Sequence, residues 1–279
     1  GSVSEASKKH VKVNGKLIRY DYLAICTGSS YCAPIKTHDV VSVNRAEILL
    51  KSTSKLKKAK NILIVGGGLV GVELAAEIAL KYREKKVFIV QSGATLIPRN
   101  HEKSIKYATD FLIKKGVEII SNEKVVSDRG RIFYTNTGRN IKADLAYFCV
   151  GIISNSGFMR KFFCDRLEEN GLIKVNEYLQ LEGENNIFAA GDINNVKEEK
   201  TAQNAEKHAE IIASNIIMLE NGKKLSKYYS RKRPLVISLG KYSAIFEGKR
   251  IVFFGFIPAF LKFLIEWMIM RRYKRLFDK

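Results

Sequence analysis

An apolar run that leads directly into a cluster of glycines marks the first third of this chain. Residues 61–65 (Asn-Ile-Leu-Ile-Val) are typical of a buried strand, and residues 66–71 (Gly-Gly-Gly-Leu-Val-Gly) follow without a break. Apolar residues at helical spacing over 72–80 predict a helix, and residues 86–90 predict the next strand. A strand, helix and strand within about 30 residues have the usual size of a βαβ unit. The pattern therefore predicts an α/β fold with mainly parallel sheets.

The spacing of the glycines predicts what this unit binds. Gly66, Gly68 and Gly71 match a pattern in which glycines permit a tight turn, close approach of a diphosphate and close packing of helix on strand. The free N–H groups at the start of the following helix favour an anion. The alternative is that the glycines serve packing alone. We predict a dinucleotide site, in which the turn is completed by Gly67, Leu69 and Val70.

Two polar residues near this turn bear on which nucleotide binds. The second strand ends in Gln91, where an acidic residue would bind the adenosine ribose of NAD. A glutamine bonds a hydroxyl without repelling a 2′-phosphate, so we expect both NADH and NADPH to be accepted; alternatively Gln91 only caps the strand. Glu73 either complements the helix dipole in the first turn or faces the reactive end of the nucleotide, and spacing alone does not decide between the two.

The rest of the chain continues the alternation. Asn14-Gly15 between apolar alternations predicts a hairpin over 11–18. Further helices are predicted over 44–60, 101–115 and 201–219, and further strands over 22–26, 117–121, 131–135, 145–150, 187–190 and 234–240.

Charge and cysteine content narrow the function. The net charge of +20 predicts either an acidic partner surface, anionic lipid or nucleic acid, or a soluble chain with a basic face. We expect no nucleic acid, because no basic patch interleaved with aromatic residues is present. The chain has four cysteines with no closely spaced pair, which argues against a disulfide framework, a zinc site and disulfide reduction. Cys26 and Cys32 have the wrong spacing for a redox pair, and Cys149 and Cys164 are isolated.

The C-terminal run over 251–270 is long and apolar enough to suggest a membrane. Pro258, Lys262 and Glu266, together with Gly255, argue against a span. A helix with one tryptophan followed by Arg271-Arg272-Tyr273-Lys274-Arg275 is typical of one that lies in a membrane interface. The alternative is a helix buried in the core or in a homodimer interface.

Three motifs in order resemble one family. Residues 20–29, 66–73 and 186–192 are similar to the strand and turn before the nucleotide domain, the nucleotide fingerprint with its glutamate, and the late flavin motif of the FAD-dependent pyridine nucleotide–disulfide oxidoreductase superfamily. Within it, residues 71–78, 172–183, 202–205 and 237–240 resemble the branch of ferroptosis suppressor proteins, apoptosis-inducing-factor homologues and type II NADH dehydrogenases. The resemblance implies FAD and NADH or NADPH as cofactors, with hydride passing to the flavin and then to a quinone.

The same resemblance implies roles for particular residues. It implies that Glu73 and Lys200 are the catalytic candidates. It also implies that Asp192 holds the ribityl chain of FAD and that Gln203 lies nearer the acceptor. His208 is a lone histidine, which is more often structural than catalytic. The remaining flavin contacts implied by the motifs are Thr27, Gly28, Gly151, Gly191, Thr201 and Ala202.

The implied architecture is a two-dinucleotide-binding-domain flavoprotein. A Rossmann-like nucleotide domain (44–150) is inserted between a remnant of the FAD domain (1–43) and its return (151–217), and a membrane or interface segment follows (218–279). Nothing before Thr27 can form the family's first FAD-binding unit. Three explanations remain open. The sequence is a fragment, a second chain completes the FAD domain, or the protein is a redox-silent scaffold or subunit that keeps only nucleotide binding. We expect a membrane-associated protein, cytoplasmic or mitochondrial.

Overall fold

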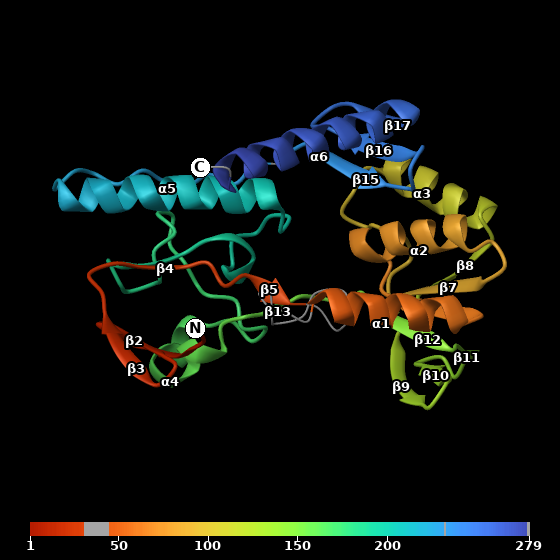
Figure 1. Cartoon of the computed structure of the whole chain (residues 1–279), viewed down its shortest axis with the longest axis horizontal. Coiled ribbons are helices and arrows are strands. Elements are labelled where there is room, and N and C mark those ends of the chain that lie inside the picture. Colours follow the sequence, from red (N-terminus) through yellow and green to blue (C-terminus); the bar gives the residue numbers. More distant parts are fainter. Residues whose placement is uncertain (31–44, 232, 278–279) are drawn as a thin grey trace. The chain divides into compact units, whose positions relative to one another are not determined.

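The computed structural model describes residues 1–30, 45–231 and 233–277. The chain divides into two compact units (Figure 1). The first unit comprises Gly1–Ser30 and Gly151–Lys232. The second spans Tyr31–Val150 and Arg233–Lys279, of which 45–150 and 233–277 are described. Cys32 and the predicted boundary at residue 43 lie outside the described residues.

The first unit is built from small sheets around one long helix. An antiparallel meander in the order β1-β2-β3 confirms the predicted hairpin, because Asn14 and Gly15 both have positive φ, as a two-residue hairpin turn needs. A parallel pair joins β4 to β14, and an antiparallel pair joins β5 to β13. The strands are β1 (Val3–Ala6), β2 (His10–Val13), β3 (Lys16–Arg19), β4 (Leu23–Ile25), β5 (Ser29–Ser30), β13 (Ile153–Ser154) and β14 (Ile187–Ala189).

Helices of this unit are mostly short. Apart from α5 (Ala202–Glu220), they are single turns, namely η1 (Gly157–Met159), α4 (Arg160–Phe163), η2 (Cys164–Arg166) and η3 (Gly191–Ile193). The sequence predicted α5 within one residue at each end but none of the single turns. Buried Ile25, Ile187 and Ile193 place the core around the parallel strands.

The second unit contains the predicted βαβ arrangement. A parallel sheet in the order β12-β6-β7-β8 is buried on both faces, which explains why its strands are continuous apolar runs. In Figure 1, α2 and α3 cover one side of this sheet and β9–β11 lie at the other. The elements are β6 (Asn61–Val65), β7 (Lys86–Gln91), β8 (Val117–Ser121), β12 (Leu145–Phe148), α1 (Arg45–Lys58), α2 (Leu69–Lys81), α3 (Glu102–Lys114), β9 (Val125–Arg129), β10 (Ile132–Thr135) and β11 (Asn140–Lys142).

Residues 235–277, here called the C-terminal module, belong to this second unit. The strands β15 (Leu235–Ser238), β16 (Ala244–Glu247) and β17 (Val252–Gly255) form an antiparallel sheet, and α6 (Phe256–Phe277) follows. Ile237, Leu239 and Ile245 are buried in the same core as α2 and α3. The sequence showed an apolar run over 251–270 in which Pro258 suits a helix start; the helix begins at Phe256, and the residues before it form β17, which was not predicted.

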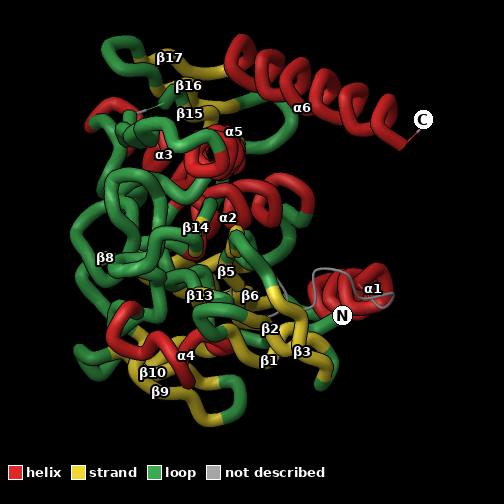
Figure 2. The backbone as a smooth tube through the Cα atoms, turned by 90° about the vertical axis from the view of Figure 1, so that its left-hand side faces the viewer, coloured by secondary structure: helices red, strands yellow, loops and turns green. Residues whose placement is uncertain are grey.

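The module is also fixed by polar contacts to α3. The buried Glu247 carboxylate accepts the His101 N–H (3.0 Å) and the Ser104 hydroxyl (2.8 Å) at the start of α3. A carboxylate at a helix N-terminus satisfies N–H groups that lack helical partners. Figure 2 shows α6 starting beside β15–β17 and extending beyond that sheet. The module is therefore anchored at its sheet, while much of α6 is exposed.

Candidate functional site

The glycine turn between β6 and α2 is shaped by close backbone contacts. Gly66 has φ +108°, and a Cβ there would lie 2.7 Å from the Cys149 carbonyl oxygen. A Cβ on Gly71 would lie only 1.9 Å from the Gly66 carbonyl oxygen, and one on Gly67 would lie 2.5 Å from Leu96 Cδ2. Backbone contacts therefore require glycine at positions 66 and 71, whereas at Gly67 the Leu96 side chain would have to move.

Gly68 differs from its neighbours. It is the N-cap of α2, with ordinary extended dihedrals (φ −73°, ψ −173°) and no side chain to cap the helix. A Cβ at Gly68 would meet no protein atom within 4 Å. Neither backbone conformation nor packing explains this glycine, whereas a ligand that approaches the helix N-terminus would. The turn therefore fits the diphosphate of NADH or NADPH, which binds where free N–H groups and the helix dipole converge.

Gln91 ends β7 beside this turn. Its Oε1 accepts a hydrogen bond from the Gly67 N–H at 2.9 Å. The side-chain carbonyl thus supports the turn, and its amide nitrogen, which can only donate, is left for other groups. The structure gives Gln91 a second role besides the one predicted at the ribose.

Glu73 is the fifth residue of α2, so it lies beyond the first turn, where the sequence predicted it. Its Oε1 accepts the N–H of Ser238 at 2.8 Å, and Lys262 Nζ lies 3.7 Å from the same oxygen. Lys262 also lies 3.9 Å from Glu266. The sequence left Glu73 between a dipole role and a role beside the nicotinamide. The structure adds a contact that neither interpretation included, because Ser238 and Lys262 belong to the C-terminal module.

A second turn lies in the first unit, at the carboxyl ends of the parallel strands β4 and β14. Thr27 and Gly28 follow β4, and Gly191 and Asp192 follow β14. Asn155 fixes Thr27 and Gly28 by two hydrogen bonds. Its side-chain amide donates to the Thr27 carbonyl (2.9 Å), and its backbone N–H donates to the Gly28 carbonyl (3.0 Å). Ligands of open α/β sheets bind at this end of the strands.

Asp192 is held at the same edge. Its Oδ2 accepts the Ser29 hydroxyl at 2.8 Å, which links the two strand ends. A half-buried carboxylate here can accept hydroxyl groups of a ligand, so this turn fits the ribityl part of FAD. The described residues before Thr27 form a β-meander without a glycine-rich strand-to-helix turn, so they do not fit the ADP part.

His208 supports this second turn from behind. Its Nδ1 accepts the Gly191 N–H at 3.0 Å, and the Asn194 amide nitrogen lies 3.2 Å from the same atom. Its Nε2 lies 3.0 Å from Glu198 Oε1, and the Tyr228 hydroxyl donates to Glu198 Oε2 at 2.7 Å. Because Nδ1 accepts a backbone N–H, the ring proton belongs on Nε2. The sequence favoured a structural role for His208 but gave no sign of its partners.

Lys200 is engaged by oxygen atoms of its own loop. Its Nζ donates to the Asn194 carbonyl (2.7 Å) and to the Val196 carbonyl (3.1 Å). Burial lowers the pKa of Lys200, against the opposing influence of nearby carboxylates. Thr201 is the N-cap of α5 through its hydroxyl, and Ala202 and Gln203 are exposed in the first turn. A loop-fixing role for Lys200 is thus present in addition to the catalytic one implied by the family.

The described cysteines form no disulfide. Burial raises the pKa of Cys149 to about 12 and raises the pKa of Cys26 as well, so both favour the protonated thiol at neutral pH. Cys164 is exposed. Within the described part of the chain, no group of three or more histidine, cysteine, aspartate or glutamate side chains could hold a metal ion.

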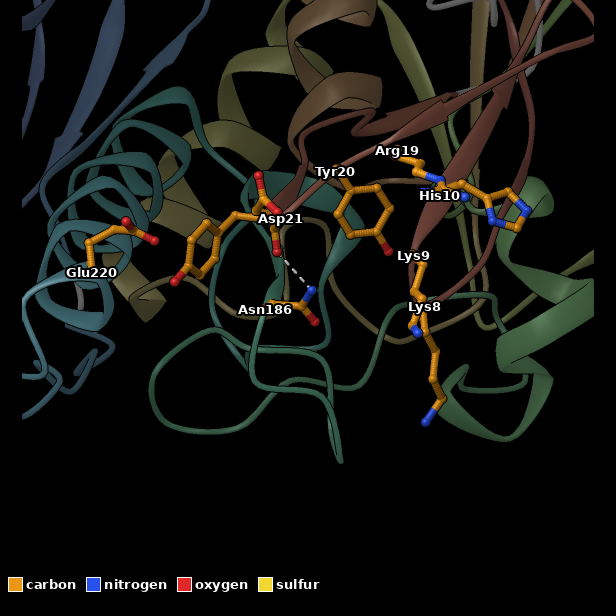
Figure 3. Close-up of a pocket in the computed structure, with 9 residues that line it drawn as sticks. Lys8, Lys9, His10, Arg19, Tyr20, Asp21, Asn186 and Glu220 are labelled. Atoms are coloured by element: carbon orange, nitrogen blue, oxygen red, sulfur yellow. Dashed lines mark hydrogen bonds between the residues drawn. The ribbon is translucent and has the colours of Figure 1, made fainter.

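A wide hollow of about 780 Å³ lies elsewhere in the first unit (Figure 3). It opens at the amino ends of β4 and β14, where the Asn186 side chain donates to the Asp21 carbonyl at 2.8 Å. The hollow is lined by basic residues of the meander, among them Lys9 and Arg19. Cofactors bind at the opposite, carboxyl ends of parallel strands, so the two turns, one in each unit, remain the candidate sites.

Comparisons with known proteins show which family this chain matches. A family model described as pyridine nucleotide-disulphide oxidoreductase matches residues 2–209. Ferroptosis suppressor protein 1 of Taeniopygia guttata is 30% identical over 255 residues, covering 88% of this chain and 68% of that protein. Apoptosis-inducing factor homolog B of Dictyostelium discoideum is 35% identical over 276 residues, covering 88% and 71%.

Solved structures share the fold. The structure of NDH2 from Plasmodium falciparum in complex with NADH has a TM-score of 0.75 at 14% identity, and the match covers 95% of this chain and 79% of that one. A water-forming NADH oxidase from Lactobacillus brevis bound to NADH has a TM-score of 0.69 at 20% identity, covering 88% and 58%. These likenesses confirm the predicted α/β fold.

Proposed function

We propose that this chain delivers electrons to a quinone at a lipid surface. The chain belongs to the pyridine nucleotide-disulphide oxidoreductase family and is an FAD- and NAD(P)H-dependent oxidoreductase. Binding of the nucleotide is supported mainly by the open space at Gly68, where a side chain would meet no protein atom within 4 Å. When bound, FAD supplies hydride acceptance and onward electron transfer.

The residues of the glycine turn bind and orient the nucleotide in this proposal. Gly66, Gly68 and Gly71 form the bend, and the N–H groups at the start of α2 bind the diphosphate. Gln91 faces the adenosine ribose and accepts either NADH or NADPH, because its amide nitrogen is a donor to a hydroxyl or a phosphate. Glu73 lies by the nicotinamide and holds its orientation.

The second turn binds the flavin. Asp192 accepts ribityl hydroxyls, Thr27 and Gly28 close the opposite side, and Gly151 permits the chain to leave β12 with positive φ. Thr201 and Ala202 flank the ring at the start of α5. In domain terms, 44–150 binds the nucleotide, 1–43 with 151–217 binds the flavin, and 218–279 docks on lipid.

The lipid surface is inferred from α6 and from the relatives. The described helices include none that is both long and apolar enough to cross a bilayer. The exposed apolar side chains of α6, the +20 charge and the basic sequence after Met270 fit a helix that lies in the interface. A lipid-soluble quinone is an acceptor that such a surface would supply.

A second candidate is a redox-silent subunit that binds nucleotide alone. Among the described residues β4 pairs only with β14, and Ala24 on β4 is exposed. No described segment before β4 offers the turn that would bind the ADP part of FAD. This candidate predicts NADH binding without turnover and a partner that pairs with β4.

One experiment separates the two. The chain is purified, incubated with and without FAD, and mixed with NADH and a short-chain ubiquinone. The proposal predicts flavin absorbance that persists after gel filtration and quinone-dependent NADH oxidation. Gly68→Val should abolish NADH oxidation without unfolding the protein. Gly157→Ala, at another glycine with open space around it, should leave NADH oxidation intact. Absence of both flavin and turnover contradicts the proposed function.

A further inference from the structure

The C-terminal module reaches the carboxylate that the proposed function places by the nicotinamide. Ser238 on β15 donates its N–H to Glu73 at 2.8 Å, and Lys262 on α6 lies 3.7 Å from the same oxygen. The two side chains of the ion pair are each about one-third exposed, so their attraction is modest and screened. The backbone bond fixes where the carboxylate points, and Lys262 sets the charge beside it.

One apolar stripe of α6 lies away from Lys262, and Ile265, Met268 and Ile269 outside this stripe are also exposed. Phe256, Phe260, Phe263, Trp267 and Met270 recur every three or four residues and are each between 47% and 62% exposed. The side of α6 that packs on the rest of the module includes Ala259, which is buried, and Leu261, which is half-buried. Lys262 is half-buried and is outside the apolar stripe. A surface that contacts the stripe would therefore leave the contact between Lys262 and Glu73 in place.

Charge identifies anionic lipid as the occupant of this stripe. Arg271 lies over the Trp267 ring at 4.2 Å, which places a cation at the edge of the stripe. Arg272, Lys274 and Arg275 follow in the sequence, and the whole chain carries +20. Interfacial helices combine aromatic residues with basic residues in this way, and each basic residue near an anionic surface adds about 1 kcal/mol.

We propose that Lys262 is a positioning residue that couples docking of α6 on anionic lipid to binding of NADH at the glycine turn. Lipid on the stripe keeps α6 seated, and a seated α6 keeps Lys262 beside Glu73. Glu73 lies in the helix that receives the anionic diphosphate, so neutralising its charge favours NADH. The inference rests on the proposed function, because it assumes that NADH binds this turn.

Coupling of this kind is reciprocal. Lipid must tighten NADH binding by the same factor by which NADH tightens lipid binding. A charge change a few ångströms from the ligand in a solvent-screened setting corresponds to about a two- to fourfold change in affinity.

The test uses the FAD-incubated full chain and two kinds of vesicle, pure phosphatidylcholine and phosphatidylcholine mixed with phosphatidylserine. Trp267 is the only tryptophan, so its emission reports on α6 alone. NADH affinity is measured with and without vesicles, and vesicle affinity by co-sedimentation with and without NADH. We expect a blue shift of Trp267 on anionic vesicles and a gain of about two- to fourfold in both affinities.

Variants assign the coupling to one contact. Lys262→Met should remove the gain while leaving the unfolding temperature and the Trp267 shift unchanged, and Lys262→Arg should restore it. In a Glu73→Gln background, Lys262→Met should have no further effect. Glu266→Gln is the matched control, because it removes the other carboxylate near Lys262 and should keep the coupling.

The contrary outcomes are distinct. A coupling that persists in Lys262→Met, or an effect of Lys262→Met that persists with Glu73→Gln, overturns the inference but leaves the proposed function standing. A Trp267 shift that depends on protein concentration and not on vesicles assigns the stripe to a second copy of the chain and also overturns it. Failure of NADH to bind under any condition overturns the proposed function itself.

Discussion

The two candidate turns, one in each unit, are fixed in different ways. The turn after β6 is shaped by glycines that its own backbone requires, and a single side chain, Gln91, supports it. The turn after β14 is supported by side-chain hydrogen bonds, from the nearby Asn194 and from His208 and Ser29, which are more distant in the sequence. One turn thus depends on the absence of side chains and the other on a buried hydrogen-bonded cluster.

This difference decides what substitution does to each turn. Adding a methyl group where backbone atoms already touch cannot be relieved by moving a side chain. Removing a buried hydrogen-bond acceptor leaves a donor without a partner, which a replacement of similar shape can repair. The first turn should therefore fail abruptly, and the second should be rescued by conservative changes.

The largest expected effect is that of Gly71→Ala, whose Cβ would lie 1.9 Å from the Gly66 carbonyl oxygen. We expect loss of NADH binding and a decrease of about 3 kcal/mol in the free energy of unfolding. Urea unfolding followed by Trp267 emission measures it, since Trp267 and the turn belong to one unit. Gly68→Ala is the matched control and should change stability by less than about 0.5 kcal/mol. Equal stability of the two variants would show that close packing does not shape this turn.

The next largest effect concerns His208. His208→Leu removes the acceptor of the Gly191 N–H, and we expect a loss of about 2 kcal/mol in stability and a lower flavin content after gel filtration. His208→Asn places an oxygen near the former Nδ1 and should retain most of the flavin. If leucine and asparagine behave alike, the hydrogen bond does not support the turn.

Gln91→Glu should shift nucleotide preference. The glutamate can still accept the Gly67 N–H, but its charge repels a 2′-phosphate, so NADPH binding should weaken about tenfold relative to NADH, or about 1.4 kcal/mol. The ratio of the two dissociation constants measures this change independently of turnover. An unchanged ratio would leave Gln91 with its structural role only.

The smallest effect is expected at the start of β6, at the opposite end of that strand from the glycine turn. Hydrogen bonds from the Asn61 and Lys60 N–H groups hold the pKa of Asp144 below its ordinary value of 3.8. A lowered folded-state pKa stabilises the fold above the unfolded value, and this stability is lost as the pH falls through the folded value. Asp144→Asn should therefore lower stability at neutral pH and flatten its dependence on pH below about 4. The control is Asp128→Asn, at an exposed position of β9, and an identical acid profile in both variants would contradict the assignment.

Sequence reasoning succeeded where structure is local. The hairpin at Asn14-Gly15 and the βαβ unit around the glycine turn follow from turn chemistry and periodicity, and β8 was predicted to the residue. It missed β9, β11 and the single-turn helices, which are short and lack a clear period. In the last apolar run, Pro258 indicated a helix start within two residues of the observed one at Phe256, but β17 before it was missed.

For the site, the sequence indicated which residues follow strand ends but not what fixes them. Glu73 and Ser238 are far apart in the chain, as are Gly191 and His208, and only the fold brings each pair together. Nothing in the sequence around His208 on α5 indicated that its ring would accept the N–H of Gly191.

Amide hydrogen exchange of residues 66–72, measured with and without saturating NADH, tests the central claim most directly. Binding of the diphosphate at the start of α2 predicts that these amides exchange more slowly with NADH, while residues 132–142 in β10 and β11 are unchanged. NADH binding that leaves the exchange of residues 66–72 unaltered would contradict the assignment of the nucleotide to this turn.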